Sequence, residues 1–222
     1  WLRAVRSPHA RARFALGDAS APLVLDFAPG AANVKAVSVN SVPVTPTYVT
    51  DHIVIPAAAL TTGATEVRIE FTAGDASLNR NPDFLYALFV PARAHLAIPV
   101  FDQPDLKARV TLTLTTPFDW KAVANGTRLR SAPTSRGIVT TFRETEPIST
   151  YLIAFAAGPW EELQAKGSRK PISLFVRKSR LADVDADSII LANDRAATWL
   201  EEYFGTRFPF QRLDVVLAPA FP

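Results

Sequence analysis

The chain has 222 residues, of which 48% are hydrophobic and 20% charged, a composition that is typical of a globular protein and excludes a fully disordered one. The absence of cysteine excludes a disulfide scaffold, an iron–sulfur protein, a thiolate zinc site and a cysteine nucleophile. The formal net charge of +3, from 24 basic and 21 acidic residues, is too balanced to predict nucleic-acid binding, and no apolar run reaches the ~20 residues of a membrane-spanning helix.

The first two thirds of the chain alternate apolar and polar residues in short runs. A period of two is typical of β-strands, and Gly, Pro, Asn or Asp, which favour turns, bound each run. Asn40 and Ser41 predict a tight turn, and Pro43, which cannot donate to a sheet, predicts an edge strand. Many short strands indicate a β-sandwich or a large curved antiparallel sheet. We expect strands at 23–27, 37–39, 42–44, 53–55, 67–71, 110–114, 137–143, 149–156 and 171–177.

The pattern changes near residue 183, where apolar residues recur at steps of three and four. This spacing predicts a helix, which Asp185 or Asp187 can cap and which Gly205 can end. A short strand at 213–217 should follow, so the helix and strand indicate the start of a second domain. Residues 166–170 are either a linker or a loop between two strands. The predicted buried face of the helix consists of Ile189, Ala192, Ala196, Leu200 and Tyr203.

Few residues suggest chemistry, because the usual local signatures of zinc, nucleotide and serine-nucleophile sites are absent. Asp102 and Asp105 could perform acid–base work if their environments separated their pKa values. We favour the alternative, in which Asp102 caps a turn and pairs with a nearby Arg or Lys, because the segment brings no other reactive group. His95 is interpreted as a structural histidine. Core packing is expected for Trp120, Trp160 and Trp199.

Residues 78–109 resemble the hallmark stretch of the aminopeptidase N family of zinc metallopeptidases, which are of the gluzincin type. The family pattern is Pro-x-aromatic-Asp-x-Pro-x-x-Lys-Ala. Residues 148–155 resemble the strand near the end of that family's N-terminal domain, and residues 203–219 resemble the opening of its catalytic domain. Three segments in the right order are specific evidence. The hallmark pattern is matched by Pro99, Phe101, Asp102, Pro104, Lys107 and Ala108.

The resemblance implies a mainly β N-terminal domain over residues 1–182 and a truncated start of an α/β thermolysin-like catalytic domain over 183–222. In the family, a G-x-M-E-N strand and a zinc-binding H-E-x-x-H helix follow the position that matches Phe221 and Pro222. A chain that lacks methionine and opens on Trp1 is therefore expected to be a fragment, with no catalytic or metal-binding residue of its own. The intact parent would use zinc to remove N-terminal residues from peptide substrates, while this fragment shapes the active-site cleft.

One loop of the family's N-terminal domain reaches the active site, where a Gln and a Glu hold the substrate's N-terminal ammonium. Aligned without gaps from Asp102, these substrate-binding positions are Leu88 and Val90, and neither side chain can pair with an ammonium. The family's usual Arg and Cys become His95 and Val100. The group that would hold the substrate α-amine is therefore altered at these positions. The alternative interpretation is that Leu88 and Val90 are simply core residues of a strand.

Two other functions are considered beside the peptidase. The first is a non-catalytic β-sandwich module that binds a protein or carbohydrate, which would be disfavoured by exposure of Trp199 or Phe210. The second is a degenerate family member without zinc ligands. We expect no nucleic-acid partner and no membrane segment in this piece. The sequence does not determine the compartment, although a periplasmic or secreted location is favoured over a cytoplasmic one.

Overall fold

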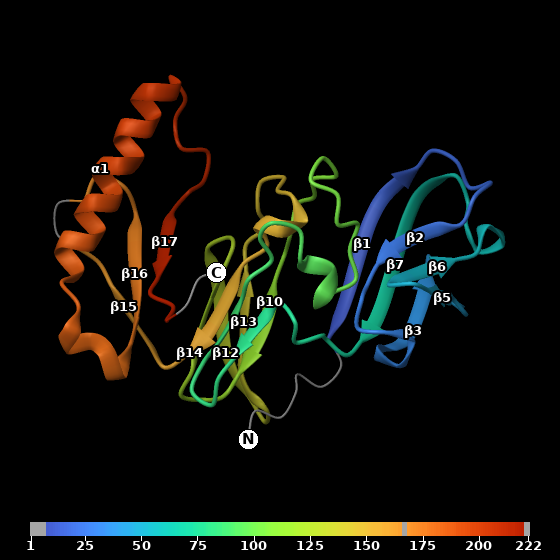
Figure 1. Ribbon diagram of the computed structural model, residues 1–222, viewed down its shortest axis with the longest axis horizontal. Coiled ribbons are helices and arrows are strands. Elements are labelled where there is room, and N and C mark those ends of the chain that lie inside the picture. The colour runs from blue at the N-terminus through green and yellow to red at the C-terminus, as the bar shows by residue number, and fades with distance from the viewer. Residues whose placement is uncertain (1–7, 166–167, 220–222) are drawn as a thin grey trace. The chain divides into compact units, whose positions relative to one another are not determined.

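A computed structural model describes residues 8–165 and 168–219 of the chain (Figure 1). Trp1, the first two residues of the 166–170 segment, and Phe221 and Pro222 lie outside the described residues. The described chain is mainly β, which confirms the predicted fold class, and it divides into two compact units. The first unit comprises residues 8–82, 87–108 and 148–154, and the second comprises 83–86, 109–147, 155–165 and 168–219.

The first unit is a β-sandwich. Its two antiparallel sheets have the strand orders β1-β7-β3-β4 and β2-β6-β5. A short strand, β8, and two 3-10 helices, η3 and η4, complete the elements used below. Their bounds are β1 (His9–Leu16), β2 (Leu23–Asp26), β3 (Val34–Val39), β4 (Val42–Val44), β5 (Thr47–Val49), β6 (His52–Ile55), β7 (Gly63–Phe71), β8 (Leu78–Arg80), η3 (Ala94–Leu96) and η4 (Thr150–Leu152).

The core of the first unit forms between these two sheets. Alternate residues of β7 are buried, as a period of two requires of a strand with one face on the core. Phe71 of β7 meets Phe27, which follows β2 in the other sheet, in an edge-to-face contact with ring centroids 5.7 Å apart. The same cluster contains Leu25, Ile53 and Ile55, each at most 2% exposed. Burial of both inner faces therefore holds the sandwich together.

The β3–β4 hairpin confirms the predicted turn. Val39 pairs with Val42, and the two residues between them, Asn40 and Ser41, have φ of 48° and 69°. Positive φ at both positions matches the right-handed twist of the strands, and Asn tolerates it well. Because β4 is the last strand of its sheet, Pro43 lies on an edge strand, as predicted.

The second unit contains three sheets and the helix. One sheet has the order β10-β13-β12, and β14 pairs with β11 on one side and with Leu85 and Tyr86 of β9 on the other. The third has the order β15-β16-β17. Their bounds are β9 (Leu85–Ala87), β10 (Thr113–Thr116), β11 (Lys121–Ala124), β12 (Arg128–Thr134), β13 (Gly137–Phe142), β14 (Phe155–Gly158), β15 (Trp160–Leu163), β16 (Ile172–Arg177) and β17 (Leu213–Val216).

Helix α1 (Ala186–Phe204) lies against β16, and β16 pairs in parallel with β17 (Figure 1). Asp185 caps the helix by accepting a hydrogen bond from the Ser188 N–H at 3.1 Å, and Gly205 ends it with φ of 62°. Both predicted helix boundaries are thus confirmed. In the part of the chain that the structure describes, no helix has the length and hydropathy of a membrane span.

The predicted buried face of α1 is wrong. The buried helix residues are Ile190, Asp194 and Ala197, because this stripe faces β16 and the loop before it. Most of the predicted face is in contact with solvent, and Leu200 and Tyr203 are 45% and 68% exposed. A list of apolar positions could not reveal that a carboxylate would occupy the centre of the buried stripe.

Two strand predictions need correction, and several strands were missed. Within 149–156, η4 replaces the first half of the expected strand, because the Ser149 and Thr150 hydroxyls bond to Pro104 O and to Asp102 instead of leaving the backbone extended. The strand expected at 110–114 begins only at Thr113. The alternation in β1 was overlooked. The division into domains at residue 182 remains a prediction.

Candidate functional site

Leu88 and Val90, the positions implied to line a cleft, follow β9 in the first unit. The Leu88 side chain is 6% exposed, and its backbone N–H donates to Ser77 O at 2.9 Å. Phe89 is also buried, whereas Val90 is 43% exposed. The segment is pinned further by Arg93, whose backbone N–H donates to Phe89 O at 2.8 Å. Of the two cleft-loop positions, Val90 is therefore the one that can contact another molecule. The cleft role of both residues stays a prediction.

Asp102 of the hallmark stretch is the centre of a polar network. Its side chain is 5% exposed. One carboxylate oxygen accepts from the Nδ1 of His95 at 2.6 Å and from the His95 backbone N–H at 3.2 Å. The other accepts from the Thr150 hydroxyl at 2.6 Å. Asp102 thus joins η3 and η4, which are far apart in the sequence.

A second histidine–aspartate pair lies next to this centre. The Asp102 backbone N–H donates to Oδ2 of Asp26 at 2.7 Å, and Oδ1 of Asp26 is 3.2 Å from Nε2 of His52. Nδ1 of His52 lies 2.5 Å from Thr50 O. The four residues therefore form a chain in the order His52, Asp26, Asp102 and His95, linked in the middle through the Asp102 backbone N–H, which we call the His–Asp chain.

The environment of Asp102 favours its ionised form. Burial alone would raise the pKa of this carboxyl, but hydrogen bonds from Thr150 and His95 outweigh it and lower the pKa below its ordinary value. Asp105 is exposed, and among the described residues no contact joins its side chain to Asp102. The structural interpretation of Asp102 is confirmed, but its partner is a histidine and not the expected Arg or Lys.

The other residues considered from the sequence fall into two groups. His95 is a structural histidine, as predicted, and Trp120 and Trp160 are buried at 9% and 0% exposure. Core packing is wrong for Trp199, which is 58% exposed on the solvent side of α1 and stacks on Tyr203 with ring centroids 5.1 Å apart. Helical spacing alone did not distinguish the solvent side from the core side.

Sequence reasoning missed a charge cluster in the second unit. Glu162 contacts Arg212 at 3.2 Å and Arg128 at 3.5 Å, and Nε of Arg212 donates to Asp214 at 2.8 Å. Burial raises the pKa of Asp214, and the negative charge of Glu162 raises it further, against the opposing effect of Arg212. The cluster ties β12, β15 and β17 together, so its arrangement is that of a structural ion-pair network.

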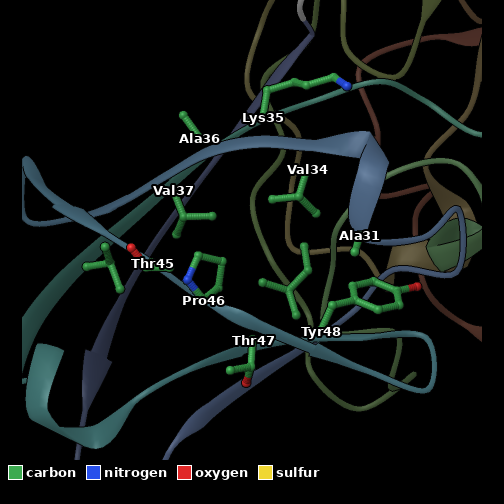
Figure 2. Close-up of a pocket in the computed structure, with 11 residues that line it drawn as sticks. Ala31, Val34, Lys35, Ala36, Val37, Thr45, Pro46, Thr47 and Tyr48 are labelled. Carbon is green, nitrogen blue, oxygen red and sulfur yellow. The ribbon is translucent and has the colours of Figure 1, made fainter.

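The first unit also has an open pocket of about 330 Å³, beside β3 and the segment that connects β4 to β5 (Figure 2). Its walls are mostly apolar and include Val34, Pro46 and the ring of Tyr48. Lys35 is the charged residue of its lining, and the Lys35 amine donates to Ala32 O at 2.5 Å. Neither cleft-loop position lines this pocket, and its residues offer no reactive group.

The zinc that the family resemblance implies would need several His, Asp or Glu side chains as ligands. Within 8–165 and 168–219, no group of three or more His, Asp or Glu side chains is arranged to hold a metal ion. These residues therefore do not fit a zinc centre, and no reaction step is assigned to them.

Comparison with known proteins finds a family model that matches the hallmark stretch. Residues 47–152 match the model of the Peptidase M1 N-terminal domain. Residues 47–152, just under half of the chain, are thus similar to an M1 N-terminal domain. This region includes β5 to β8, the cleft-loop positions and the Asp102 network, so the resemblance to the aminopeptidase N family is confirmed.

Several curated relatives are similar to this chain over much of its length. Aminopeptidase N of Streptomyces lividans is 29% identical over 142 residues, which cover 62% of this chain and 16% of the relative. Glutamyl aminopeptidase of Homo sapiens is 27% identical, with 59% of this chain and 14% of the relative covered. Aminopeptidase N of Acetobacter pasteurianus is 28% identical, with 68% and 41% covered. The chain therefore spans less than half of the length of each of these relatives.

Proposed function

We propose that the chain is the N-terminal portion of a zinc-dependent metallopeptidase that removes N-terminal residues from peptides. The observation that carries this proposal is the M1 N-terminal domain at residues 47–152, together with relatives that are named aminopeptidases. In the proposed enzyme, this portion shapes the active-site cleft and has no activity alone. Zinc and its ligands would come from the rest of the parent.

The loop at 88–90 gives the proposal a distinctive feature. Leu88 and Val90 carry no oxygen or nitrogen on their side chains, so they cannot accept a hydrogen bond from a substrate ammonium. We propose that the parent holds the α-amine with a group outside these two positions. Val90, which is 43% exposed, would then offer the substrate an apolar contact.

Exposed apolar side chains favour a larger enzyme over an independent binding module. Trp199, Tyr203 and Phe204 are 58%, 68% and 68% exposed, and Phe210 is 44% exposed. The ring of Tyr203 contacts those of Trp199 and Phe204 along the end of α1. Contiguous apolar surface of this kind commonly marks a region that packs against more protein.

The test compares the parent with the 222-residue chain. Elemental analysis would measure bound zinc, and two matched peptides, one with a free amine and one N-acetylated, would measure cleavage. We expect about one zinc per parent chain, cleavage of the free-amine peptide only, and neither property in the 222-residue chain. A parent without zinc and without cleavage would overturn the peptidase proposal.

The loop is tested by substitution in an active parent. Val90→Glu places a carboxylate at an exposed position, so we expect a lower KM for the free-amine peptide with little change in stability. Val90→Gln adds similar length without charge and is the control. Leu88→Gln buries an amide and should instead destabilise the protein by about 1–3 kcal/mol. Equal effects of Val90→Glu and Val90→Gln on KM would contradict the proposed site.

A further inference from the structure

The His–Asp chain differs from the other ion pairs of the protein. Elsewhere in residues 8–165 and 168–219, carboxylates that form ion pairs do so with Lys or Arg, which stay charged at neutral pH. Asp26 and Asp102 pair with His52 and His95. Histidine is the side chain whose ordinary change of charge falls between about pH 5 and 8. Protons can therefore alter this network in a range where the other pairs stay intact.

The two aspartates make the network depend on those protons. A single backbone N–H, that of Asp102, connects them at 2.7 Å from Oδ2 of Asp26, so the two histidine–aspartate pairs belong to one network. Among the described contacts no Lys or Arg reaches either one. With both imidazoles protonated, two positive charges balance two negative ones. With both neutral, each carboxylate of the network is left without a cationic partner in a partly buried place, which is unfavourable.

His52 adds a geometric requirement. Its Nδ1 faces the carbonyl oxygen of Thr50 at 2.5 Å and its Nε2 faces Oδ1 of Asp26 at 3.2 Å, and both of these atoms only accept hydrogen bonds. A neutral imidazole carries one N–H, whereas an imidazolium carries two. Both contacts can be hydrogen bonds only when His52 is protonated, so loss of the proton removes one of them.

We infer that the His–Asp chain is a proton-dependent staple that fastens the hallmark stretch to the β-sandwich. It joins β2, the start of β6, η3 with the residues up to Asp102, and η4. The staple is complete when His52 carries a proton on both ring nitrogens, and it loses one contact when this imidazole is neutral. Because hydrogen bonds lower the pKa of Asp102, this carboxyl stays ionised across the neutral range, and the imidazoles act as the switch.

The other titratable and charged groups on neighbouring segments interact with partners outside the His–Asp chain. The Tyr48 hydroxyl donates to Phe27 O, and burial together with the charge of Asp51 raises the Tyr48 pKa above its ordinary value. The Arg93 guanidinium donates to Ala76 O at 2.6 Å. In the described part of the chain, no hydrogen bond or ion pair joins Tyr48, Asp51 or Arg93 to either imidazole. They therefore do not substitute for the histidine protons.

The test is amide hydrogen exchange by NMR on the 222-residue chain at about pH 5.5 and about pH 8. After correction for the intrinsic effect of pH, protection of the Asp102 amide should fall roughly fivefold at the higher pH, the size expected for one lost hydrogen bond. The variant with His52→Arg and His95→Arg carries permanent cations, so its protection should not change. His9→Arg is the matched control, since His9 lies exposed on β1, and it should behave as the unaltered protein.

The result that overturns the inference is an Asp102 amide whose protection is independent of pH, or one that responds equally in the double variant. If that variant does not fold, the unaltered chain gives the answer. Its three histidines are His9, His52 and His95, and the chemical shift of the Asp102 amide should follow the two network imidazoles and not His9. If the chemical shift of the Asp102 amide follows none of the three histidines, the inference is likewise overturned. No activity is measured, so this outcome is independent of the proposed peptidase.

Discussion

Asp194 offers the sharpest test of what holds the second unit together. It lies on the buried face of α1 at 6% exposure, and its two carboxylate oxygens accept separately from the backbone N–H groups of Arg169 and Lys170, at 3.1 and 3.2 Å. Hydrogen bonds to a charged acceptor contribute about 1.5–3 kcal/mol each. Since the receiving loop is partly in contact with solvent, we use the lower limit. Asp194→Ala should therefore cost about 3 kcal/mol of unfolding free energy.

Asp194→Asn separates this mechanism from simple loss of packing. Its amide keeps one acceptor oxygen, so we expect about half of the alanine cost. Urea denaturation followed by circular dichroism would measure the free energies, and amide exchange at Arg169 and Lys170 would report the lost bonds directly. Glu202→Ala, at an exposed position of α1, should change stability by less than about 0.5 kcal/mol. A cost below about 1 kcal/mol for Asp194→Ala, or equal costs for Ala and Asn, would refute the reasoning.

Two further predictions concern a turn and an acid transition. Gly126 has φ of 81°, and a Cβ there would overlap a backbone carbonyl oxygen, so Gly126→Ala should lower the free energy of unfolding by more than about 2 kcal/mol in urea denaturation. Gly17→Ala, where open space surrounds the new methyl group, should be neutral or slightly stabilising. Because hydrogen bonds from Thr150 and His95 lower the pKa of Asp102 in the folded state, its contribution is present above the unfolded pKa of about 4 and is lost as pH falls through the folded one. Asp102→Asn should reduce the loss of stability between about pH 4 and pH 2, measured as the urea midpoint; an unchanged acid slope would contradict this.

Local rules of the sequence predicted a good part of the fold. The β3–β4 hairpin follows from alternation and from Asn40 and Ser41 at its turn, and the limits of α1 follow from Asp185 and Gly205. These turn and capping signals act between residues that are only a few positions apart in the sequence and are therefore close in space. The buried face of α1 was wrong because it is chosen by the loop that bonds to Asp194, and that partner is not visible in the spacing of apolar residues.

The candidate site shows the same division. Leu88 and Val90 were located by family resemblance, which supplies a position but not whether a side chain is buried. Asp102 was singled out as structural from its own segment, yet its bond to Asp26 joins residues 76 positions apart. No periodic pattern reports such a pairing. The sequence could therefore identify the members of the His–Asp chain only as separate polar residues.

Pro43 affects whether the β4 edge of one molecule can pair with a strand of another. Val39 and Val42 close a two-residue turn, and Val37 pairs with Val44, so the backbone of Pro43 points away from β3 toward solvent. An ordinary residue would offer a foreign strand both an N–H and a carbonyl oxygen there. Proline leaves only the carbonyl, so a second chain cannot extend the sheet by a two-way ladder at β4. The hairpin thus presents a blunted edge that resists strand-to-strand aggregation.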